Sequence, residues 1–389
     1  MLAKTANRNG IWLSLVLVAA AIVGVAAALA FTALGSDESQ ASAGAPNSVA
    51  SVRSETLRAP AAPAPAPDPT IDLCAKEGTT TIPGASTVAI WGFALKPDGV
   101  PCSDESVVAQ LPGPPLVVNE GDAVTVNLYN ELTVNLSIVF PQVEMLPDTL
   151  GAAPGGSANY SFSADRPGTF LYEAGTVAQE SGMGPSSCSD GINNDEDEDS
   201  LVDGDDPECT SAGNSRVQVG MGLFGPLIIR PSDGASFAYD DPDTAFNFEA
   251  ILVLSEIDPD LNADPFGFDM DDYDPHYWLI NGKAYPDTSE ILADASSQVV
   301  FRYLNAGLTQ HTMEVVGFHQ AVIAGDAYPL NYSYEAVSLT VASGQTFDTI
   351  GTVPAAPSGT QYPLYNANLH VTNGSAFPGG MLTFVTVAP

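Results

Sequence analysis

The residues with the clearest chemical potential form one acidic run between Cys188 and Cys209. This run contains ten acidic residues and no basic one. Carboxylate and amide oxygens are the hard ligands that calcium prefers, and so many negative charges in a short loop repel one another unless a cation lies among them. The run therefore predicts a calcium site. The candidate ligands are Asp190, Asn193, Asp195, Asp197, Asp199, Asp203 and Asp206.

Two other interpretations of this loop remain open. An EF-hand that started at Asp195 would have Gly at its sixth position and Glu at its twelfth, where this sequence has Ser200 and Asp206. The spacing therefore favours a repeat-type calcium loop over a helix-flanked EF-hand. The loop could also be a solvated acidic segment that only collects diffuse cations.

The first seventy residues predict an exported protein. An apolar run without a charge covers residues 11–34 and follows Lys4 and Arg8, which is typical of a signal or membrane-anchor helix over residues 1–34. The length of the apolar run favours an uncleaved helix that anchors the protein in the membrane. The alternative is a cleaved signal peptide, for which residues 28–30 (Ala-Leu-Ala) could serve as the cleavage site. We expect display at the cell surface or in the periplasm, or secretion if the helix is cleaved.

A spacer and an acidic surface follow the helix. Residues 35–72 are rich in Ala, Pro and Ser and predict a disordered linker. The formal net charge of the chain is −36 at pH 7, which excludes nucleic acid as a partner of the exported part and favours metal cations. The same charge could be an adaptation of the surface to salty surroundings.

An oxidising compartment makes disulfides the expected state of the cysteines. The chain has four, at positions 74, 102, 188 and 209, and four cysteines allow three pairings. We expect Cys74 to pair with Cys102, because both lie in one N-terminal segment. We expect Cys188 to pair with Cys209, because together they bracket the acidic loop.

The elements that must position these residues are short strands. β-rich runs recur after the linker between clusters of Gly, Pro, Asn and Asp, and they fall into two sets separated by a polar break at residues 230–244. This spacing predicts an all-β protein with two antiparallel Greek-key β-sandwiches. We expect the first domain over residues 73–232, with the acidic loop 188–209 as an insertion, and the second over residues 245–389.

Several motifs resemble the multicopper oxidases in order and spacing. In the first half they are Gly113–Asp122, Pro154-Gly155-Gly156, Arg166–Tyr172 and Met221–Ile229. In the second half they are Tyr277–Lys283, Asn305–Gly325 and Gly379–Leu382. The resemblance covers nearly everything from about residue 80 onward. It implies that both sandwiches are cupredoxin-like, that is, plastocyanin-like, domains, and it leaves a homo-oligomer possible, since family relatives often form trimers.

The resemblance also implies copper. Members of the family oxidise substrates at a blue copper held by two His and one Cys, and pass electrons to a three-copper centre held by eight His. Imidazole and thiolate bind copper strongly in a geometry suited to redox cycling. This chain contains four His in total. Sharing copper centres between subunits does not help, because each chain of a symmetric oligomer must still contribute, on average, a full set of ligands. We therefore expect that most copper ligands have been lost.

Alignment of the motifs places other residue types at the family's copper positions. In the first domain these positions fall on Val139-Phe140-Pro141 and on Glu173-Ala174-Gly175. In the second domain they fall on residues 311–317 and on Asn366-Ala367-Asn368. His311 retains the histidine of the family motif, whereas the other two ligand positions within residues 311–317 are occupied by Glu314 and Val316. None of the four cysteines falls on the position of the copper cysteine.

A smaller metal site is a further hypothesis. Three histidines, with or without a thioether sulfur, could meet at the base of the second domain and hold one copper or zinc ion. The candidates are His311, His319 and His370, with Met313 or Met381. Histidines in the strands of a sandwich are more often packed and hydrogen-bonded, and that interpretation is favoured. We interpret His276 as structural.

These observations lead to one functional hypothesis and one alternative. The hypothesis is an exported, multicopper-oxidase-like protein without catalytic residues, acting as a surface binding or structural module with calcium in its acidic loop. The alternative is a copper-dependent, laccase-like oxidoreductase with a reduced copper complement. A protein that uses its acidic surface to bind cations in general is a third interpretation.

Overall fold

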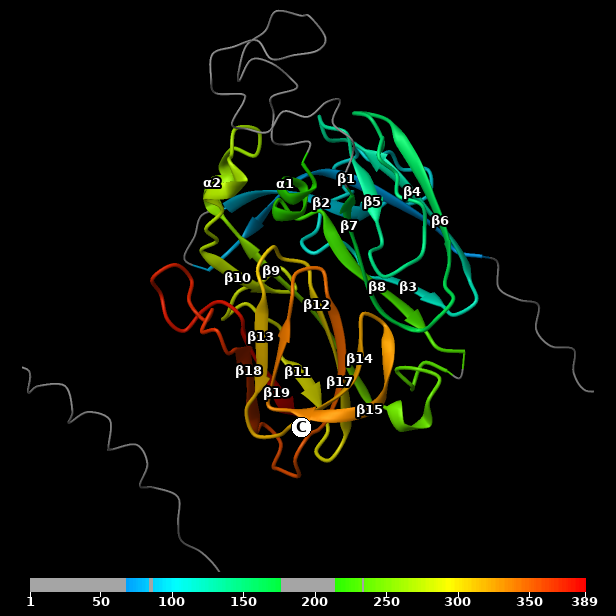
Figure 1. The fold of residues 1–389 in the computed structure, drawn as a ribbon. Helices are drawn as coiled ribbons and strands as arrows, with labels where there is room; N and C mark the ends of the chain where they lie inside the picture. Colours follow the sequence, from blue (N-terminus) through cyan, green and yellow to red (C-terminus); the bar gives the residue numbers. More distant parts are fainter. Residues whose placement is uncertain (1–67, 84–86, 176–213, 233) are drawn as a thin grey trace, which may run out of the picture. The chain divides into compact units, whose positions relative to one another are not determined.

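The computed structural model describes residues 68–83, 87–175, 214–232 and 234–389. The strands of the first half are β1 (Thr70–Thr81), β2 (Thr87–Leu95), β3 (Leu116–Asn119), β4 (Ala123–Asn130), β5 (Ser137–Val139), β6 (Ser157–Ser163), β7 (Gly168–Gly175) and β8 (Phe224–Arg230). Within the described residues they form two sheets, in the orders β2-β1-β4-β6 and β3-β8-β7-β5 (Figure 1).

The second half is built in the same way. Its strands are β9 (Phe248–Ile257), β10 (Tyr277–Ile280), β11 (Ile291–Ala293), β12 (Gln298–Asn305), β13 (His311–Val315), β14 (Gln320–Gly325), β15 (Tyr328–Ala336), β16 (Ser338–Val341), β17 (Thr346–Thr352), β18 (Gln361–Asn366) and β19 (Leu382–Val387). They form the sheets β10-β9-β12-β17-β14-β15 and β11-β19-β18-β13-β16. The prediction of an all-β fold with two sandwiches is confirmed.

Each sheet contains one parallel strand pair, which the sequence did not predict. The parallel pairs are β1 with β4, β3 with β8, β9 with β12, and β11 with β19. All other pairs between these strands are antiparallel. Parallel neighbours cannot be joined by a tight hairpin, so the chain crosses between the two sheets of each sandwich before it returns. Regular alternation in the sequence reveals strands but not these partners.

The alternation of buried and exposed residues along the strands shows which sheet faces form the core. In β4 every second residue is buried, and Val124, Val126 and Leu128 are at most 1% exposed. Their side chains point to one face of the sheet, as the two-residue period of a strand requires. The core of the first half also includes Val253 and Leu304 of the second half, so the two sandwiches pack against each other through apolar side chains.

Helices are few and short in the described residues. They are α1 (Ser215–Gly220), α2 (Pro259–Ala263) and the single 3-10 turns Pro242–Thr244 and Met270–Asp272. The Asp258 carboxylate caps α2 by accepting from the amides of Asp260 and Leu261, which satisfies donors that a helix start leaves open. No helix in this part of the chain is long and apolar enough to cross a membrane.

Two boundaries predicted from the sequence can be compared with the structure. The chain enters β1 at Thr70, slightly before the expected end of the linker, because Ile71 and Leu73 align with Val126 and Leu128 of β4. The Cys74–Cys102 disulfide is confirmed, with 5.6 Å between the Cα atoms. The predicted helix 1–34, the acidic loop 188–209 and the Cys188–Cys209 pair lie outside the described residues. Of the predicted linker 35–72, only residues 68–72 are described.

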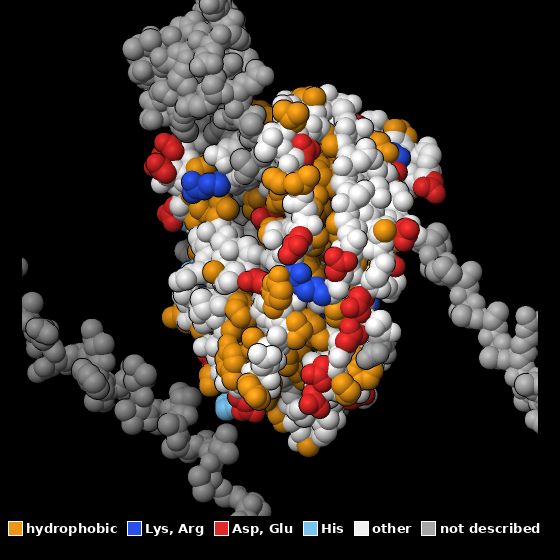
Figure 2. Space-filling model, turned by 45° about the vertical axis from the view of Figure 1, so that its right-hand side comes forward, with side chains coloured by type: hydrophobic (Ala, Val, Ile, Leu, Met, Phe, Trp, Pro, Cys, Tyr) orange, Lys and Arg blue, Asp and Glu red, His pale blue; other side chains and the backbone are white. Residues whose placement is uncertain are grey.

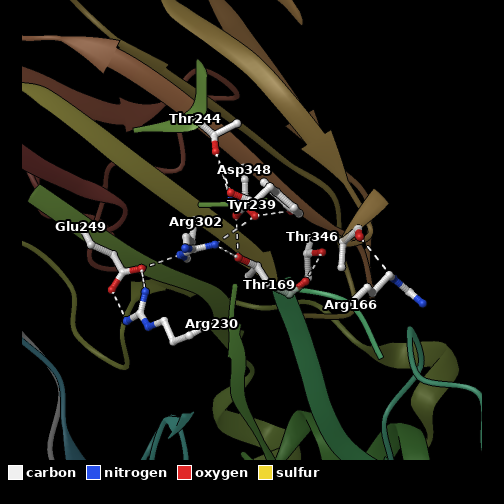
Figure 3. Close-up of polar contacts among 10 residues, drawn as sticks. Arg166, Thr169, Arg230, Tyr239, Thr244, Glu249, Arg302, Thr346 and Asp348 are labelled. Atoms are coloured by element: carbon white, nitrogen blue, oxygen red, sulfur yellow. Dashed lines mark hydrogen bonds and ion pairs between the residues drawn. The ribbon is translucent and has the colours of Figure 1, made fainter. Parts of the chain in front are cut away.

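A buried cluster of charged side chains joins the two halves (Figure 3). Its centre is Arg302 of β12, whose side chain has no exposed surface. The guanidinium group donates from Nε to Glu249 (2.6 Å) and from Nη1 to Asp348 (3.1 Å). Nη1 also lies 3.0 Å from the hydroxyl of Thr169 in the first half. The charge is therefore paired with two carboxylates, as a buried charge requires, while Nη2 has no hydrogen-bond partner among the described residues.

Asp348 of β17 connects the same two halves from the other side. Its carboxylate accepts from the hydroxyl groups of Thr169 and Tyr239, each at 2.6 Å. Thr346 donates to the carbonyl oxygen of Thr169 at 2.8 Å. The hydroxyl and the carbonyl of one residue on β7 are thus both bound by β17 across the junction.

Glu249 of β9 completes the cluster at the protein surface. Arg230 donates to both of its carboxylate oxygens, each at 2.5 Å. Burial alone would raise the pKa of Glu249, but the hydrogen bonds from Arg230 and the charge of Arg302 outweigh burial and hold the pKa below its ordinary value. Glu249 therefore stays ionised in the folded protein and balances the two arginines.

A glycine permits the close approach of the halves. Gly168 has φ +142°, and a Cβ atom there would lie 2.8 Å from the Cβ of Ala327 and 3.0 Å from the hydroxyl oxygen of Tyr239. Any larger residue would both strain the backbone and push the halves apart.

Replacing Arg302 with Met tests the importance of the cluster. We expect Arg302→Met to lower the free energy of unfolding by about 3 kcal/mol or more, because it leaves Asp348 and part of Glu249 as buried, unpaired charges. Arg216→Met, at an exposed position, is the matched control and should change it by less than about 0.5 kcal/mol. Urea unfolding measures both, and equal effects of the two substitutions would contradict the prediction.

Candidate functional site

The aligned copper positions of the second domain hold a buried hydrogen-bonded group. His311 begins β13 and Asn366 ends β18, and both are completely buried. The Nε2 atom of His311 lies 2.9 Å from Oε2 of Glu256, and its Nδ1 atom lies 3.3 Å from the amide nitrogen of Asn366. A carboxylate only accepts and an amide nitrogen only donates, so Nε2–H donates to Glu256 and Nδ1 accepts from Asn366.

Glu256 of β9 is fixed by the turn that follows β12. Its Oε1 atom accepts from the backbone amides of Leu308 (2.6 Å) and Thr309 (2.9 Å). Gly307 is required beside it, because a Cβ atom at that position would lie 2.0 Å from Oε2 of Glu256. The buried carboxylate thus has donors on both oxygens, which offsets the loss of its hydration.

Glu256 also affects a neighbouring tyrosine. The hydroxyl group of Tyr273 lies 3.4 Å from Oε1 of Glu256. Burial raises the pKa of Tyr273 strongly, and the negative charges of Glu256 and Asp258 raise it further. The tyrosine is therefore a neutral donor at physiological pH and not a proton acceptor.

His370 lies next to this group but differs from His311. Its ring stacks on Trp278, with 3.6 Å between ring centroids and 7° between planes, and its centroid is 5.8 Å from that of His311. Burial, followed by the nearby His311, lowers the pKa of His370, while Glu256 opposes the shift. Its Nδ1 atom is buried and has no hydrogen-bond partner among the described residues.

The structure brings together only some of the predicted metal ligands. Met313 and Met381 are both part of the apolar core of the second half. Met381 lies beside Asn366, with Sδ 3.4 Å from the amide nitrogen. His319 has a largely exposed side chain and lies 3.3 Å from the carboxylate of Glu335. His276 is also exposed, and its Nε2 atom is 3.8 Å from Asp274.

The three predicted histidines therefore lie in different surroundings: His311 is buried, His370 is partly exposed beside it, and His319 is exposed elsewhere. Among the residues that the structure describes, no group of three or more His, Cys, Asp or Glu side chains is arranged to hold a metal ion.

The aligned copper positions of the first domain also lie next to each other. Val139 of β5 is the register partner of Glu173 of β7. Phe140 is buried and packs against Phe162, with 4.8 Å between ring centroids. Burial raises the pKa of Glu173 to about 7. Apolar side chains and one weakly acidic carboxyl group stand where the alignment places imidazoles.

The remaining candidate site cannot be compared with the structure. All seven candidate calcium ligands, from Asp190 to Asp206, lie between the described residues 175 and 214.

Comparisons with known proteins agree with this architecture. A family model described as multicopper oxidase matches residues 105–188. Laccase-7 of Oryza sativa subsp. japonica is 25% identical over 276 residues, which are 67% of this chain and 43% of laccase-7. Laccase-3 of the same plant is 23% identical over 314 residues, 73% of this chain and 46% of laccase-3. This chain therefore spans less than half the length of these curated relatives.

Solved structures support the fold independently. The blue copper oxidase from Nitrosomonas europaea matches with a TM-score of 0.61 at 20% identity, covering 81% of this chain and 85% of that one. The copper nitrite reductase from Nitrosomonas europaea matches with a TM-score of 0.56 at 18% identity, covering 82% and 93%. At such identities the likeness shows a shared fold. Together with the family model and the laccase relatives, it shows that the chain has a cupredoxin-type fold and is similar to the multicopper oxidases.

The similarity to multicopper oxidases implies copper, so the residues present must be tested against it. A copper ion at His311 would have to displace either the hydrogen bond to Glu256 or that from Asn366. The nearby side chains offer a second imidazole (His370) and a thioether (Met381), but an amide in place of the thiolate, and the two described cysteines are joined in a disulfide. This donor set does not fit the blue-copper site that the resemblance implies.

Sequence reasoning missed Glu256 as a member of the site. Its signal was visible, because β9 reads Phe-Glu-Ala-Ile-Leu-Val-Leu-Ser-Glu-Ile and places one acid near the end of an otherwise apolar run. A carboxylate at such a buried position needs a partner. The identity of that partner, 55 residues further along the chain, could not be predicted.

Truncating Glu256 tests whether this group stabilises the fold. We expect Glu256→Ala to lower the free energy of unfolding by about 3 kcal/mol or more, because it leaves the buried His311 and the part-buried amides of Leu308 and Thr309 without an acceptor. Glu335→Ala removes the partner of the exposed His319 and should change it by less than about 0.5 kcal/mol. Thermal and urea unfolding compare the two, and an effect of Glu256→Ala no larger than the control would refute the interpretation.

Proposed function

We propose that this chain is a non-catalytic cupredoxin module of the multicopper oxidase family, which acts in binding or surface organisation. One observation carries the proposal: both ring nitrogens of His311 are engaged by Glu256 and Asn366 in a fully buried group. A metal ligand needs a free lone pair on nitrogen. Here the structural role of the imidazole competes directly with coordination.

The number of ligands supports the same proposal. The chain contains four His, two of which, His276 and His319, have mostly exposed side chains beside single carboxylates. Electron transfer from a substrate to oxygen in this family needs both kinds of copper centre. A chain with two adjacent imidazoles cannot supply the ligands of both.

The setting of this module is also a proposal. An N-terminal helix over residues 1–34 and a linker rich in Ala and Pro would hold the sandwiches away from a membrane, at the cell surface or in the periplasm. Calcium in the loop 188–209 would neutralise its carboxylates and order that segment. The acidic composition, with a net charge of −36, supports cations as partners.

Copper content tests the central proposal. We expect the protein, loaded with Cu(II) and dialysed, to retain well below one tightly bound copper per chain and to lack the visible absorption of a thiolate–copper bond. The control variant His311→Phe/His370→Phe should retain the same small amount. Metal analysis by mass spectrometry measures the content. Near-stoichiometric copper that is lost in the variant would overturn the proposal.

One observation favours the alternative, a copper-dependent oxidoreductase with a reduced copper complement. His370 carries a buried nitrogen without a partner, 5.8 Å from His311 between ring centroids and near the site of Met381. Oxygen uptake with phenols that depends on added copper and is abolished by His370→Phe would establish this alternative. The stacked aromatic ring on Trp278 is kept in that variant, so a general loss of folding would not explain the result.

Calcium addition tests the role of the acidic loop. We expect calcium at about one hundred times its dissociation constant to stabilise the protein by about 2.7 kcal/mol and so to raise its melting temperature. The variant Asp195→Asn/Asp197→Asn should lose this rise. Asp287→Asn/Asp294→Asn removes the same charge at exposed positions of the second half and should keep it. A rise that is absent in all three proteins would remove calcium from the proposal.

A further inference from the structure

The outermost strand of the six-stranded sheet exposes an unusual set of large side chains. β15 pairs with β14 alone in the part of the chain that the structure describes. Four residues at alternate positions are exposed, namely Tyr328 (56%), Leu330 (40%), Tyr332 (90%) and Tyr334 (52%). Large apolar side chains that are exposed together on one strand mark candidate contact sites.

Two hollows flank this strand. One of about 320 Å³ is lined by Tyr328 together with the carboxylates of Glu144 and Asp326. The other, of about 280 Å³, is lined by Leu330 and Tyr332 together with Asp241 and Asp243. No Lys or Arg lines either hollow. In Figure 2, hydrophobic and acidic side chains lie next to each other over the lower part of the face shown.

The chemistry of the hollows points to a cation with an apolar stem. Ile323, which is 8% exposed, and Leu330 provide apolar lining in the second hollow, while its two carboxylates provide charge. Lysine and arginine side chains have this combination of parts, since their carbon stems cover apolar surface while the charged head stays near solvent. Aromatic rings add a further attraction for such heads.

The protein already contains one contact of this type at the same strand. The guanidinium carbon of Arg166 lies 4.1 Å from the ring centroid of Tyr328 and 5.3 Å from that of Phe170. Arg166 is held there by donating to the carbonyl oxygens of Ala327 (3.2 Å) and Gln142 (2.6 Å). β15 thus binds a guanidinium group through a tyrosine at its first residue, while Tyr332 near its middle is 90% exposed.

We propose that β15 and its two flanking hollows form a docking surface for an extended, lysine- or arginine-rich segment of a partner protein. Two hollows, each with two carboxylates, could receive cationic side chains on either side of the tyrosines. A second copy of this chain is disfavoured as the occupant, because it would bring the same carboxylates and a net charge of −36 to the same place. Acidic peptides and nucleic acids are excluded for the same reason.

This inference rests on the proposed binding role, but the two can fail separately. Copper analysis tests whether the module is catalytic, whereas peptide binding tests only this surface. A protein that binds copper tightly could still dock a basic segment at β15.

Peptide binding by variants at β15 tests the docking surface. The probe is a fluorescently labelled synthetic peptide of alternating Arg and Ser residues, as long as β15, at physiological ionic strength. We expect Tyr332→Ser to weaken binding about threefold or more through the loss of aromatic contact. We expect Asp241→Asn/Asp243→Asn to weaken it about fivefold or more through the loss of two charges beside the bound cations. Fluorescence anisotropy measures both.

The matched control has the same chemistry in another place. Asp241 caps a 3-10 turn by accepting from the Asp243 amide at 2.9 Å, and Asp269 caps another by accepting from the Asp271 amide at 2.9 Å. Asp269→Asn/Asp271→Asn therefore removes the same charge from the same kind of turn, with asparagine keeping each cap. This control should leave peptide affinity within about twofold of the unchanged protein.

Three results would overturn the proposal. Equal weakening by the two Asp→Asn pairs would mean that the peptide responds to total charge alone. Unchanged affinity in Tyr332→Ser would mean that the tyrosines make no contact. Sedimentation analysis that shows self-association of the unchanged protein, abolished by Tyr332→Ser without any effect on peptide affinity, would assign the surface to a second copy of the chain.

Discussion

The buried guanidinium of Arg302 is the constraint on which the arrangement of the two sandwiches depends. It is surrounded by Glu249 and Asp348 of the second half and by the Thr169 hydroxyl of the first. A buried ion pair adds little net stability compared with apolar packing of the same volume, but an unpaired charge in the same place is strongly destabilising. Because its partners come from both halves, the cluster favours the relative position of the halves in which these groups meet.

The same reasoning explains the group around His311. The aligned copper positions lie at strand ends that come from distant parts of the chain, and in this protein hydrogen bonds connect them. Glu256, His311 and Asn366 link β9, β13 and β18. Both ring nitrogens of His311 and both carboxylate oxygens of Glu256 have hydrogen-bond partners. Such pairing allows polar side chains to remain in an apolar core. His370, with one unpartnered nitrogen, is the exception and the natural starting point for any residual metal binding.

The surface follows a different principle from the interior. Inside, the carboxylates of Glu249, Glu256 and Asp348 are matched by arginines, a histidine, hydroxyl groups or backbone amides, whereas acidic residues heavily outnumber basic ones in the whole chain. Such a surface repels other copies of itself and attracts cations. The tyrosines of β15 differ from the rest of this acidic surface, because they provide exposed apolar contact area. The carboxylates beside them favour positively charged partners.

The sequence by itself determined the fold class, the two-sandwich organisation and the Cys74–Cys102 bridge. These depend on local signals, namely period-two alternation as in β4, turn residues such as Gly121, and the short spacing of the first two cysteines. The small number of histidines was also evident, because counting them needs no coordinates. The acidic loop and the N-terminal helix remain predictions.

The tertiary structure alone decided which of the remaining side chains meet. Glu256 and His311 are 55 residues apart, and Thr169 and Asp348 are 179 residues apart. Their contacts depend on which strands become neighbours, including the four parallel pairs that no local pattern reveals. The separation of His319 from His311 and His370 has the same cause. Strand alternation records which face a residue occupies, but the pairing of distant strands, driven by burial of the whole core, decides what lies opposite it.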